Sequence, residues 1–133
     1  MLRNLAQIIL YDNDQRVFLQ VRDEKAPTNP NTLGLFGGAI EDGENAETAV
    51  KRECKEELNY NLSSPRLWDK SEYTIGENDG TRFVYIEKYD EKILLDCREG
   101  NGEWLKCDKA LKDSRLQDID RPILQRLKDE LLS

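Results

Sequence analysis

The stretch from Gly37 to Tyr60, GGAIEDGENAETAVKRECKEELNY, predicts a glycine-rich loop that leads into a helix. Asn45 is a good N-cap, and Glu47 follows in the first turn, where the helix dipole favours negative charge. Asn59 is suited to the left-handed conformation that ends many helices. We therefore expect a helix over residues 46–58, and the rest of the chain is organised around it.

Three glutamates stand close together on this predicted helix. Apolar residues recur every four positions and predict a buried stripe that packs on a sheet, namely Ala46, Val50, Cys54 and Leu58. Glu53, Glu56 and Glu57 stand at i, i+3 and i+4, within an arc of roughly 100° beside that stripe. Clustered like charges destabilise a helix by roughly 0.2–0.5 kcal/mol per pair, so the cluster indicates a site. Carboxylates without imidazole or thiolate suit a hard cation, Mg²⁺ or Mn²⁺. Taken alone, the same cluster is typical of a solvated acidic helix face.

The spacing of glycine, glutamate and arginine around this cluster is more specific. Residues 38–60 follow the pattern Gly38-x5-Glu44-x7-Arg52-Glu53-Cys54-x-Glu56-Glu57-x-Asn59-Tyr60. This pattern resembles the signature box of the Nudix hydrolases, the MutT-like nucleoside diphosphate-X hydrolases. Every charged position and the first glycine match. The departures are Asn59 in place of the last glycine, Cys54 and Tyr60 at the two apolar positions, and Phe36 where the family often has proline.

The resemblance implies a fold and an activity. The expected fold is an α/β/α sandwich with a central mixed β-sheet, formed by a single domain over residues 1–133. The expected activity is Mg²⁺-dependent hydrolysis, by metal-activated water, of a phosphoanhydride in a nucleoside diphosphate linked to another moiety. Nucleoside triphosphates (oxidised ones included) and nucleotide sugars belong to that class. A catalytically silent Nudix-like module that binds a nucleotide or a partner protein is the alternative. A plain acidic metal-binding or interaction domain would need neither Gly37-Gly38 nor Arg52.

The resemblance also assigns roles to individual residues. The implied metal ligands are the Gly37 carbonyl, Glu53, Glu56, Glu57 and an acidic residue from a later loop, for which Glu99 is the first candidate and Glu103 the second. Arg52 is expected to orient Glu53 through a bidentate pair, and these two residues complete the implied catalytic set with Glu56, Glu57 and Glu99. Glu44 is expected to hold the loop or support the ligands from behind. A solvated loop carboxylate is an equally good interpretation of Glu99.

The expected substrate-binding residues are Arg22, Gly37, Gly38 and Asp120. Gly37 and Gly38 let the backbone approach a ligand without side chains in the way. Arg22 ends a predicted strand and can reach a phosphate, although a surface ion pair is the commoner use of such a residue. Asp120 precedes a predicted helix at a position where relatives contact a base.

Composition excludes several other classes of function. The 133 residues carry a net charge of −7, which argues against binding of nucleic-acid polymers or acidic membranes. The chain has no histidine, so Ser-His-Asp and Cys-His catalysis are excluded. Its three cysteines are an odd number without CxxC spacing, which favours reduced thiols in a cytoplasmic protein. We expect neither a signal peptide nor a membrane span, and a monomer or homodimer with a small nucleotide substrate.

The remaining elements are predicted from alternation and turn residues. Strands are expected over residues 6–11, 16–22, 66–75, 81–89 and 104–107. Residues 26–35 are expected to form a loop, and Glu77–Gly80 a hairpin turn. A short helical turn is expected over 108–112, and an amphipathic helix, with Pro122 in its first turn, closes the chain over 121–132.

Overall fold

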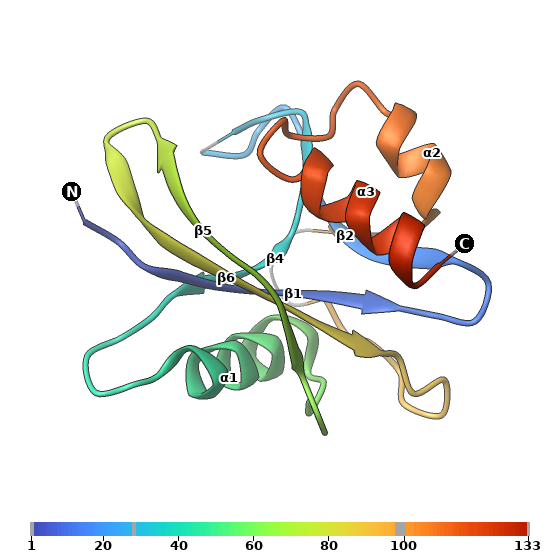
Figure 1. The fold of residues 1–133 in the computed structure, drawn as a ribbon, viewed down its shortest axis with the longest axis horizontal. Coiled ribbons are helices and arrows are strands. Elements are labelled where there is room, and N and C mark those ends of the chain that lie inside the picture. The colour runs from blue at the N-terminus through green and yellow to red at the C-terminus, as the bar shows by residue number, and fades with distance from the viewer. Residues whose placement is uncertain (1, 28, 98–100, 133) are drawn as a thin grey trace.

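The computed structural model describes residues 2–27, 29–97 and 101–132. A mixed β-sheet lies between two helical layers, with α1 on one face and α2 and α3 on the other (Figure 1). The elements in chain order are β1 (Leu5–Tyr11), β2 (Arg16–Arg22), β3 (Thr32–Gly34), β4 (Phe36–Ala39), α1 (Ala46–Leu58), β5 (Arg66–Ile75), β6 (Asn78–Lys88), β7 (Asn101–Lys106), α2 (Cys107–Lys112) and α3 (Arg121–Glu130).

Strand β1 is the centre of the sheet. The main strand order is β3-β2-β1-β6-β5, with β4 paired to β1 and β7 paired to β2. The β1–β6 pair is parallel and the other strand pairs are antiparallel, so the sheet is mixed. The α/β/α sandwich with a central mixed sheet is thereby confirmed.

The alternation of side chains along β1 divides the core in two. Ala6, Ile8 and Leu10 pack with the buried face of α1, whereas Ile9 packs with α2 and α3. Leu124 and Leu127 of α3 are fully buried against this second face, and burial of such a side chain contributes roughly 1.5–3 kcal/mol.

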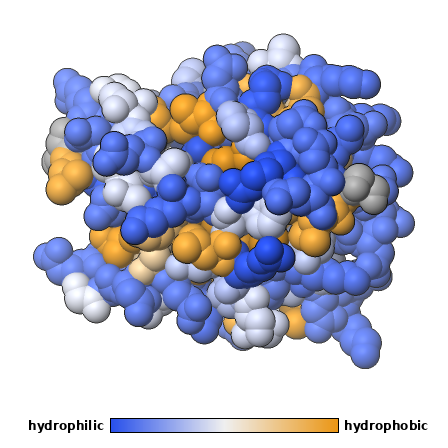
Figure 2. Space-filling view, in the orientation of Figure 1, coloured by the Kyte–Doolittle hydropathy of each residue, from blue (hydrophilic) through white to orange (hydrophobic). Residues whose placement is uncertain are grey.

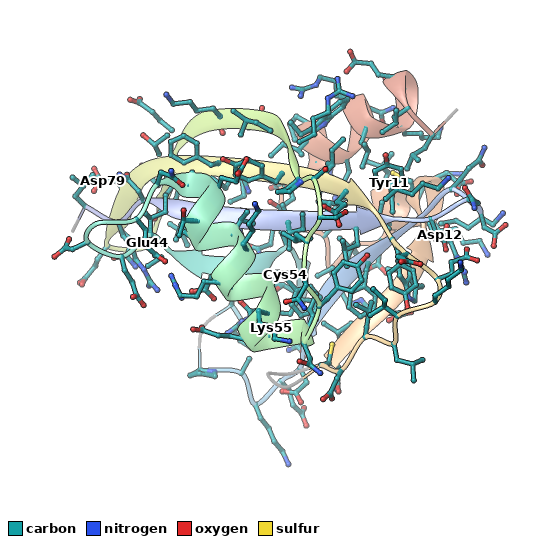
Figure 3. The ribbon with its side chains drawn as sticks, turned by 90° about the horizontal axis from the view of Figure 1, so that it is seen from below. Tyr11, Asp12, Glu44, Cys54, Lys55 and Asp79 are labelled. Atoms are coloured by element: carbon teal, nitrogen blue, oxygen red, sulfur yellow. The ribbon has the colours of Figure 1, made fainter. Side chains whose placement is uncertain are left out.

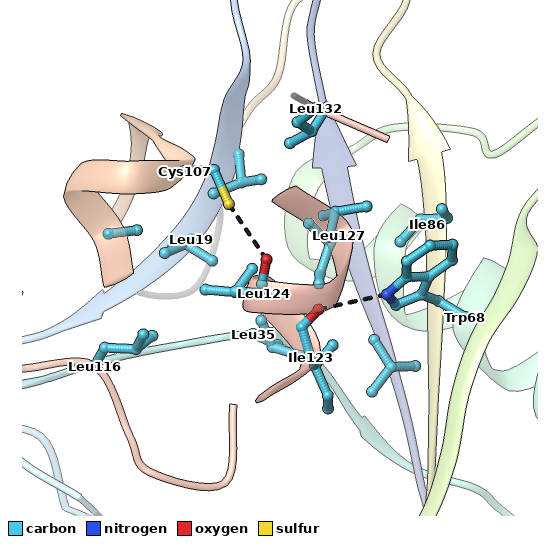
Figure 4. Close-up of a cluster of buried hydrophobic side chains, with 14 of the residues drawn as sticks. Leu19, Leu35, Trp68, Ile86, Cys107, Leu116, Ile123, Leu124, Leu127 and Leu132 are labelled. Carbon is cyan, nitrogen blue, oxygen red and sulfur yellow. Dashed lines mark hydrogen bonds between the residues drawn. The ribbon is translucent and has the colours of Figure 1, made fainter. Parts of the chain in front are cut away.

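Two hydrogen bonds fix α3 within this second part of the core. The Trp68 indole N–H donates to the Ile123 carbonyl at 3.4 Å, and the Cys107 thiol donates to the Leu124 carbonyl at 3.6 Å (Figure 4). Both accepting carbonyls belong to α3, so the helix is held from β5 on one side and from α2 on the other.

Helix α1 begins and ends where the sequence predicts. The Asn45 side chain accepts a hydrogen bond from the Thr48 N–H at 2.8 Å, which caps the first turn. Asn59 is left-handed, with φ 51° and ψ 38°, and its N–H donates to the Lys55 carbonyl. Of the predicted stripe, Val50, Cys54 and Leu58 are buried and Ala46 is half-buried. Ala49 and Glu57 are buried as well.

Three local predictions were wrong. The strand predicted over 104–107 is β7, which already begins at Asn101 and ends at Lys106, so Cys107 belongs to α2. Residues 26–35 are not only a loop, because β3 pairs with β2 through Thr32–Gly34. The β5–β6 hairpin turns at Gly76–Glu77 and not at Glu77–Gly80, since β6 already begins at Asn78. Gly76 has φ 58°, and a two-residue hairpin loop favours glycine where the first position takes a positive φ.

The three cysteines are free, and two of them are buried. Burial raises the pKa of the Cys54 thiol to about 12 and that of Cys107 to about 11, so both remain protonated near neutral pH. The interpretation of Cys54 as a core residue is confirmed.

The surface of the molecule is mostly polar. The face in Figure 2 is mostly hydrophilic, interrupted by small hydrophobic areas. Within the described ranges, no helix is both long and apolar enough to cross a membrane.

Candidate active site

Arg52 on α1 forms hydrogen bonds with three glutamates of the box, Glu44, Glu53 and Glu56. Its Nε and Nη2 groups donate to the two carboxylate oxygens of Glu44 at 2.7 and 2.9 Å. Its Nη1 group donates to Glu53 Oε1 at 2.9 Å and to Glu56 Oε2 at 3.3 Å, and Nη2 also donates to the Ala39 carbonyl at 3.1 Å. The bidentate partner of Arg52 is therefore Glu44, and the prediction of a bidentate pair with Glu53 was wrong. Glu53 follows Arg52 directly in the sequence and accepts from Nη1 only. Glu44 lies in the preceding loop and faces the guanidinium, so its two carboxylate oxygens accept from both Nε and Nη2.

Glu44 also holds the loop before α1, as expected. Its Oε1 accepts a hydrogen bond from the Glu41 N–H at 2.9 Å, and Figure 3 shows Glu44 on this loop, away from Cys54 and Lys55 on the helix. The hydrogen bonds from Arg52, followed by the one from the Glu41 backbone, lower the pKa of the Glu44 carboxyl from 4.5 to about 2.

This lowered pKa predicts an acid-dependent stability. A carboxyl whose pKa is depressed in the folded state stabilises the fold above its unfolded pKa, and this contribution is lost as the pH falls from about 4.5 towards about 2. We expect Glu44→Gln to flatten this part of the stability profile, measured by urea unfolding between pH 2 and pH 7. Asp108→Asn, which removes an exposed carboxylate from α2, is the control for the change in net charge. Equal slopes for Glu44→Gln and the unaltered protein would contradict the role of Glu44.

The two glycines of β4 are needed for close packing. A Cβ at Gly38 would lie 2.6 to 2.9 Å from the carboxylate atoms of Glu53, so this carboxylate rests against the strand backbone. Gly37 has φ 146°, and a Cβ there would lie 2.2 Å from the Ala6 carbonyl oxygen. The space beside Gly38 is thus filled by the Glu53 carboxylate, and the space beside Gly37 is filled by β1.

The three glutamates of the box that lie on α1 differ in exposure. The Glu53 side chain is 15% exposed and that of Glu56 is 55% exposed, whereas residue Glu57 is buried. Among the described residues, no three cysteine or acidic side chains form a group that could hold a metal ion. The assignment of Glu53, Glu56, Glu57 and the Gly37 carbonyl as metal ligands therefore stays a prediction.

The chemistry of these groups nevertheless fits a hard cation. The nearby thiol of Cys54 stays protonated, so carboxylate and backbone oxygens are the available donors. The bonds to Arg52 use one oxygen each of Glu53 and Glu56.

A polar cavity of about 190 Å³ adjoins Gly37 and Gly38 on the sheet face that carries α3. All four residues predicted to bind substrate line this cavity, namely Arg22, Gly37, Gly38 and Asp120. Its described lining includes three arginines, Arg3, Arg22 and Arg82, against one acid, Asp120. The cavity is thus locally cationic in a protein whose net charge is −7. Gly38 links the two parts of the site, because it lines the cavity and touches the Glu53 carboxylate.

Asp120 is tied into a buried ion pair at this cavity. Its Oδ1 accepts from Arg82 Nη1, and Arg82 Nη2 donates to the Ile119 carbonyl at 2.7 Å. Both side chains of the pair are 3% exposed. Burial raises the pKa of the Asp120 carboxyl and the charge of Arg82 opposes that rise.

Sequence reasoning missed Arg82 and Gln7 as cavity residues. Arg82 shares a strand face with the buried Val84 and Ile86, and Gln7 precedes the buried Ile9 on the same face of β1. A polar residue at a core-facing strand position is the signal that could have identified them.

The remaining predicted ligands are Glu99 and Glu103. Glu99 lies outside the described residues. Glu103 is exposed on β7, opposite Leu19 of β2.

Comparisons with known proteins give one family model for the sequence and several solved structures with the same fold. A sequence model of the NUDIX domain matches residues 1–127. A MutT protein from Methanosarcina mazei Go1 superposes with a TM-score of 0.81 at 19% identity, over 97% of this chain and 94% of that one. A MutT NUDIX hydrolase from Burkholderia pseudomallei gives 0.78 at 23% identity, over 96% and 98%. A C. elegans Ap4A hydrolase gives 0.80 at 16% identity, over 98% of each chain. No curated protein matches the sequence.

Proposed function

The chain belongs to the NUDIX domain family, and from this premise we propose that it hydrolyses a phosphoanhydride bond in a nucleoside diphosphate linked to another moiety. Water is the nucleophile and Mg²⁺ or Mn²⁺ is the cofactor in this proposal. MutT proteins and an Ap4A hydrolase share the fold, which supports a small nucleotide substrate. The three free thiols support a cytoplasmic location.

The contact between Gly38 and Glu53 is the observation that carries the proposal. It brings a carboxylate of the box against the same glycine that lines the cationic cavity. A substrate whose phosphates lie along Gly37 and Gly38 would meet the arginines on one side and the glutamates on the other. A solvated acidic helix face would not require this packing.

In this proposal, the side chains of the protein position the substrate phosphates and the divalent cation. Arg52 holds Glu53 and Glu56 together, which reduces their repulsion and fixes their direction. Arg22 lines the cavity and would bind a phosphate oxygen. Glu53, Glu56, Glu57 and the Gly37 carbonyl would hold the divalent cation. When bound, such a cation supplies Lewis-acid stabilisation of the charge that develops on the phosphates.

A substrate panel tests the proposal. Nucleoside triphosphates, nucleotide sugars, dinucleoside polyphosphates and dinucleotide cofactors are incubated with Mg²⁺ and scored for phosphate and pyrophosphate release. The proposal expects turnover of at least one class, and loss of that turnover when EDTA replaces Mg²⁺. If no compound is hydrolysed but calorimetry detects Mg²⁺-dependent nucleotide binding, the chain is the silent binding module instead.

Gly38→Ala tests the packing of Glu53 directly. The added methyl group overlaps the end of a flexible side chain, so we expect the fold to persist while the Glu53 carboxylate is displaced. A displacement of about 1 Å in a catalytic group costs roughly 100-fold in rate, and we expect a loss of that order in kcat. Circular dichroism and the melting temperature report the fold. A folded Gly38→Ala protein with unchanged kcat would contradict the role of this contact.

A further inference from the structure

Two polar atoms of the cavity residues lack hydrogen-bond partners. Within the described part of the chain, Gln7 Oε1 and Arg82 Nε are the side-chain nitrogen and oxygen atoms that are buried without one. Both residues line the polar cavity. Buried polar groups in folded proteins are nearly always paired, and leaving one unpaired costs free energy, so this coincidence in one cavity requires an explanation.

The two residues are held as neighbours by the sheet. Arg82 of β6 is paired with Leu5 of β1, and Val84 with Gln7, so Gln7 and Arg82 are diagonal neighbours on one face. Arg82 is immobilised through its other two nitrogens by Asp120 and the Ile119 carbonyl.

The pair presents one charged donor and one neutral acceptor. A phosphate or carboxylate satisfies the guanidinium N–H but brings no donor to Gln7 Oε1. A carbonyl beside an N–H satisfies both, because its oxygen accepts from the cation and its N–H donates to the amide oxygen. Adenine and cytosine lack this amide edge, whereas guanine, uracil and the carboxamide of nicotinamide carry it.

We propose that Gln7 and Arg82 select the part of the substrate that carries an amide edge, a carbonyl beside an N–H. The proposal rests on the proposed function only in taking the ligand to be a nucleotide. In the proposed orientation, the phosphates of the nucleotide lie at Arg22, Gly37 and Gly38. Its amide edge lies at Gln7 and Arg82.

The size of the site agrees with this orientation. At about 190 Å³ the cavity is smaller than the roughly 300–1,000 Å³ of ligand pockets, so it takes one end of a nucleotide. A second cavity of about 380 Å³ shares Gln20 and Arg22 with it and offers room for the phosphates that extend past Arg22.

Direct binding without turnover tests the proposal. Isothermal titration in EDTA compares five mononucleotides, GMP, UMP, nicotinamide mononucleotide, AMP and CMP, with ribose 5-phosphate, so the result does not depend on hydrolysis. We expect at least one of the first three to bind about tenfold or more tighter than AMP, CMP and ribose 5-phosphate, as one unpaired buried group demands. Which of the three binds identifies the source of the amide edge.

Gln7→Met removes the acceptor at similar volume and should abolish this preference while ribose 5-phosphate binds as before. Gln20→Met is the matched control, because Gln20 lines the same cavity but its Oε1 accepts from Arg22 at 3.5 Å. It should keep the preference among bases. The proposal is overturned if no mononucleotide binds, if AMP or CMP binds as tightly as the amide-bearing ligands, or if Gln7→Met keeps the preference. If the substrate panel shows no turnover but this binding pattern is found, only the hydrolase proposal fails.

Discussion

Glu56→Gln and Glu57→Gln should each lower kcat by roughly 100-fold or more, the loss seen when one group that stabilises a charged transition state is removed. Glutamine keeps the size of glutamate but loses the charge that is proposed to hold the cation. Turnover of the best substrate from the panel, at saturating Mg²⁺, is the measurement.

Glu47→Gln provides the control for these two variants. Glu47 lies on the same helix, but its exposed side chain pairs with Lys51 at 3.4 Å, away from Arg52. We expect unchanged kcat for this variant and native circular dichroism for all three. If Glu56→Gln and Glu57→Gln both keep full turnover, the box glutamates are not the catalytic groups.

Arg82→Met is expected to destabilise the fold by about 3–5 kcal/mol, because it leaves the Asp120 carboxylate buried without its cation. Both partners are 3% exposed, so solvent cannot replace the lost charge. Urea unfolding at pH 7 gives the free energy of unfolding.

The double variant Arg82→Met/Asp120→Leu separates the buried charge from the loss of packing. Replacing both partners of a buried ion pair with apolar residues is often nearly neutral, so the double variant should recover most of the loss. If Arg82→Met alone costs under about 1 kcal/mol, a range typical of exposed pairs, the pair does not behave as a buried one.

The sequence predicted correctly those helices and strands whose ends are marked by capping or turn residues. Helix α1 could be placed because Asn45 caps its start and Asn59 takes the left-handed conformation at its end. Strands β2 and β5 match their predicted bounds, since polar turns flank an alternating or apolar run. Strand β3 was missed because it is three residues long in a stretch rich in proline and asparagine, and only its pairing with β2 makes it a strand.

Sequence spacing describes the candidate site only where its residues are local. Glu53, Glu56, Glu57 and Arg52 lie on one helix, so their spacing places them on neighbouring turns. Glu44 is the bidentate partner of Arg52 because of the path of the loop before α1. The spacing of residues in the sequence does not determine that path. The pairing of Arg82 with Asp120 joins residues 38 positions apart, and the register of β1 against β6 decides where Gln7 stands.

Binding of Mn²⁺ in the absence of substrate tests the central claim most directly, because it examines the cation and the carboxylates without any assumption about the reaction. The loss of the free Mn²⁺ signal in electron paramagnetic resonance gives the affinity of the unaltered protein and of the Glu56→Gln/Glu57→Gln variant. The account predicts that the unaltered protein binds the ion and that the double variant binds it roughly tenfold or more weakly, since ligand charge sets the affinity for such cations. Equal binding by the two proteins, or none by either, would contradict it.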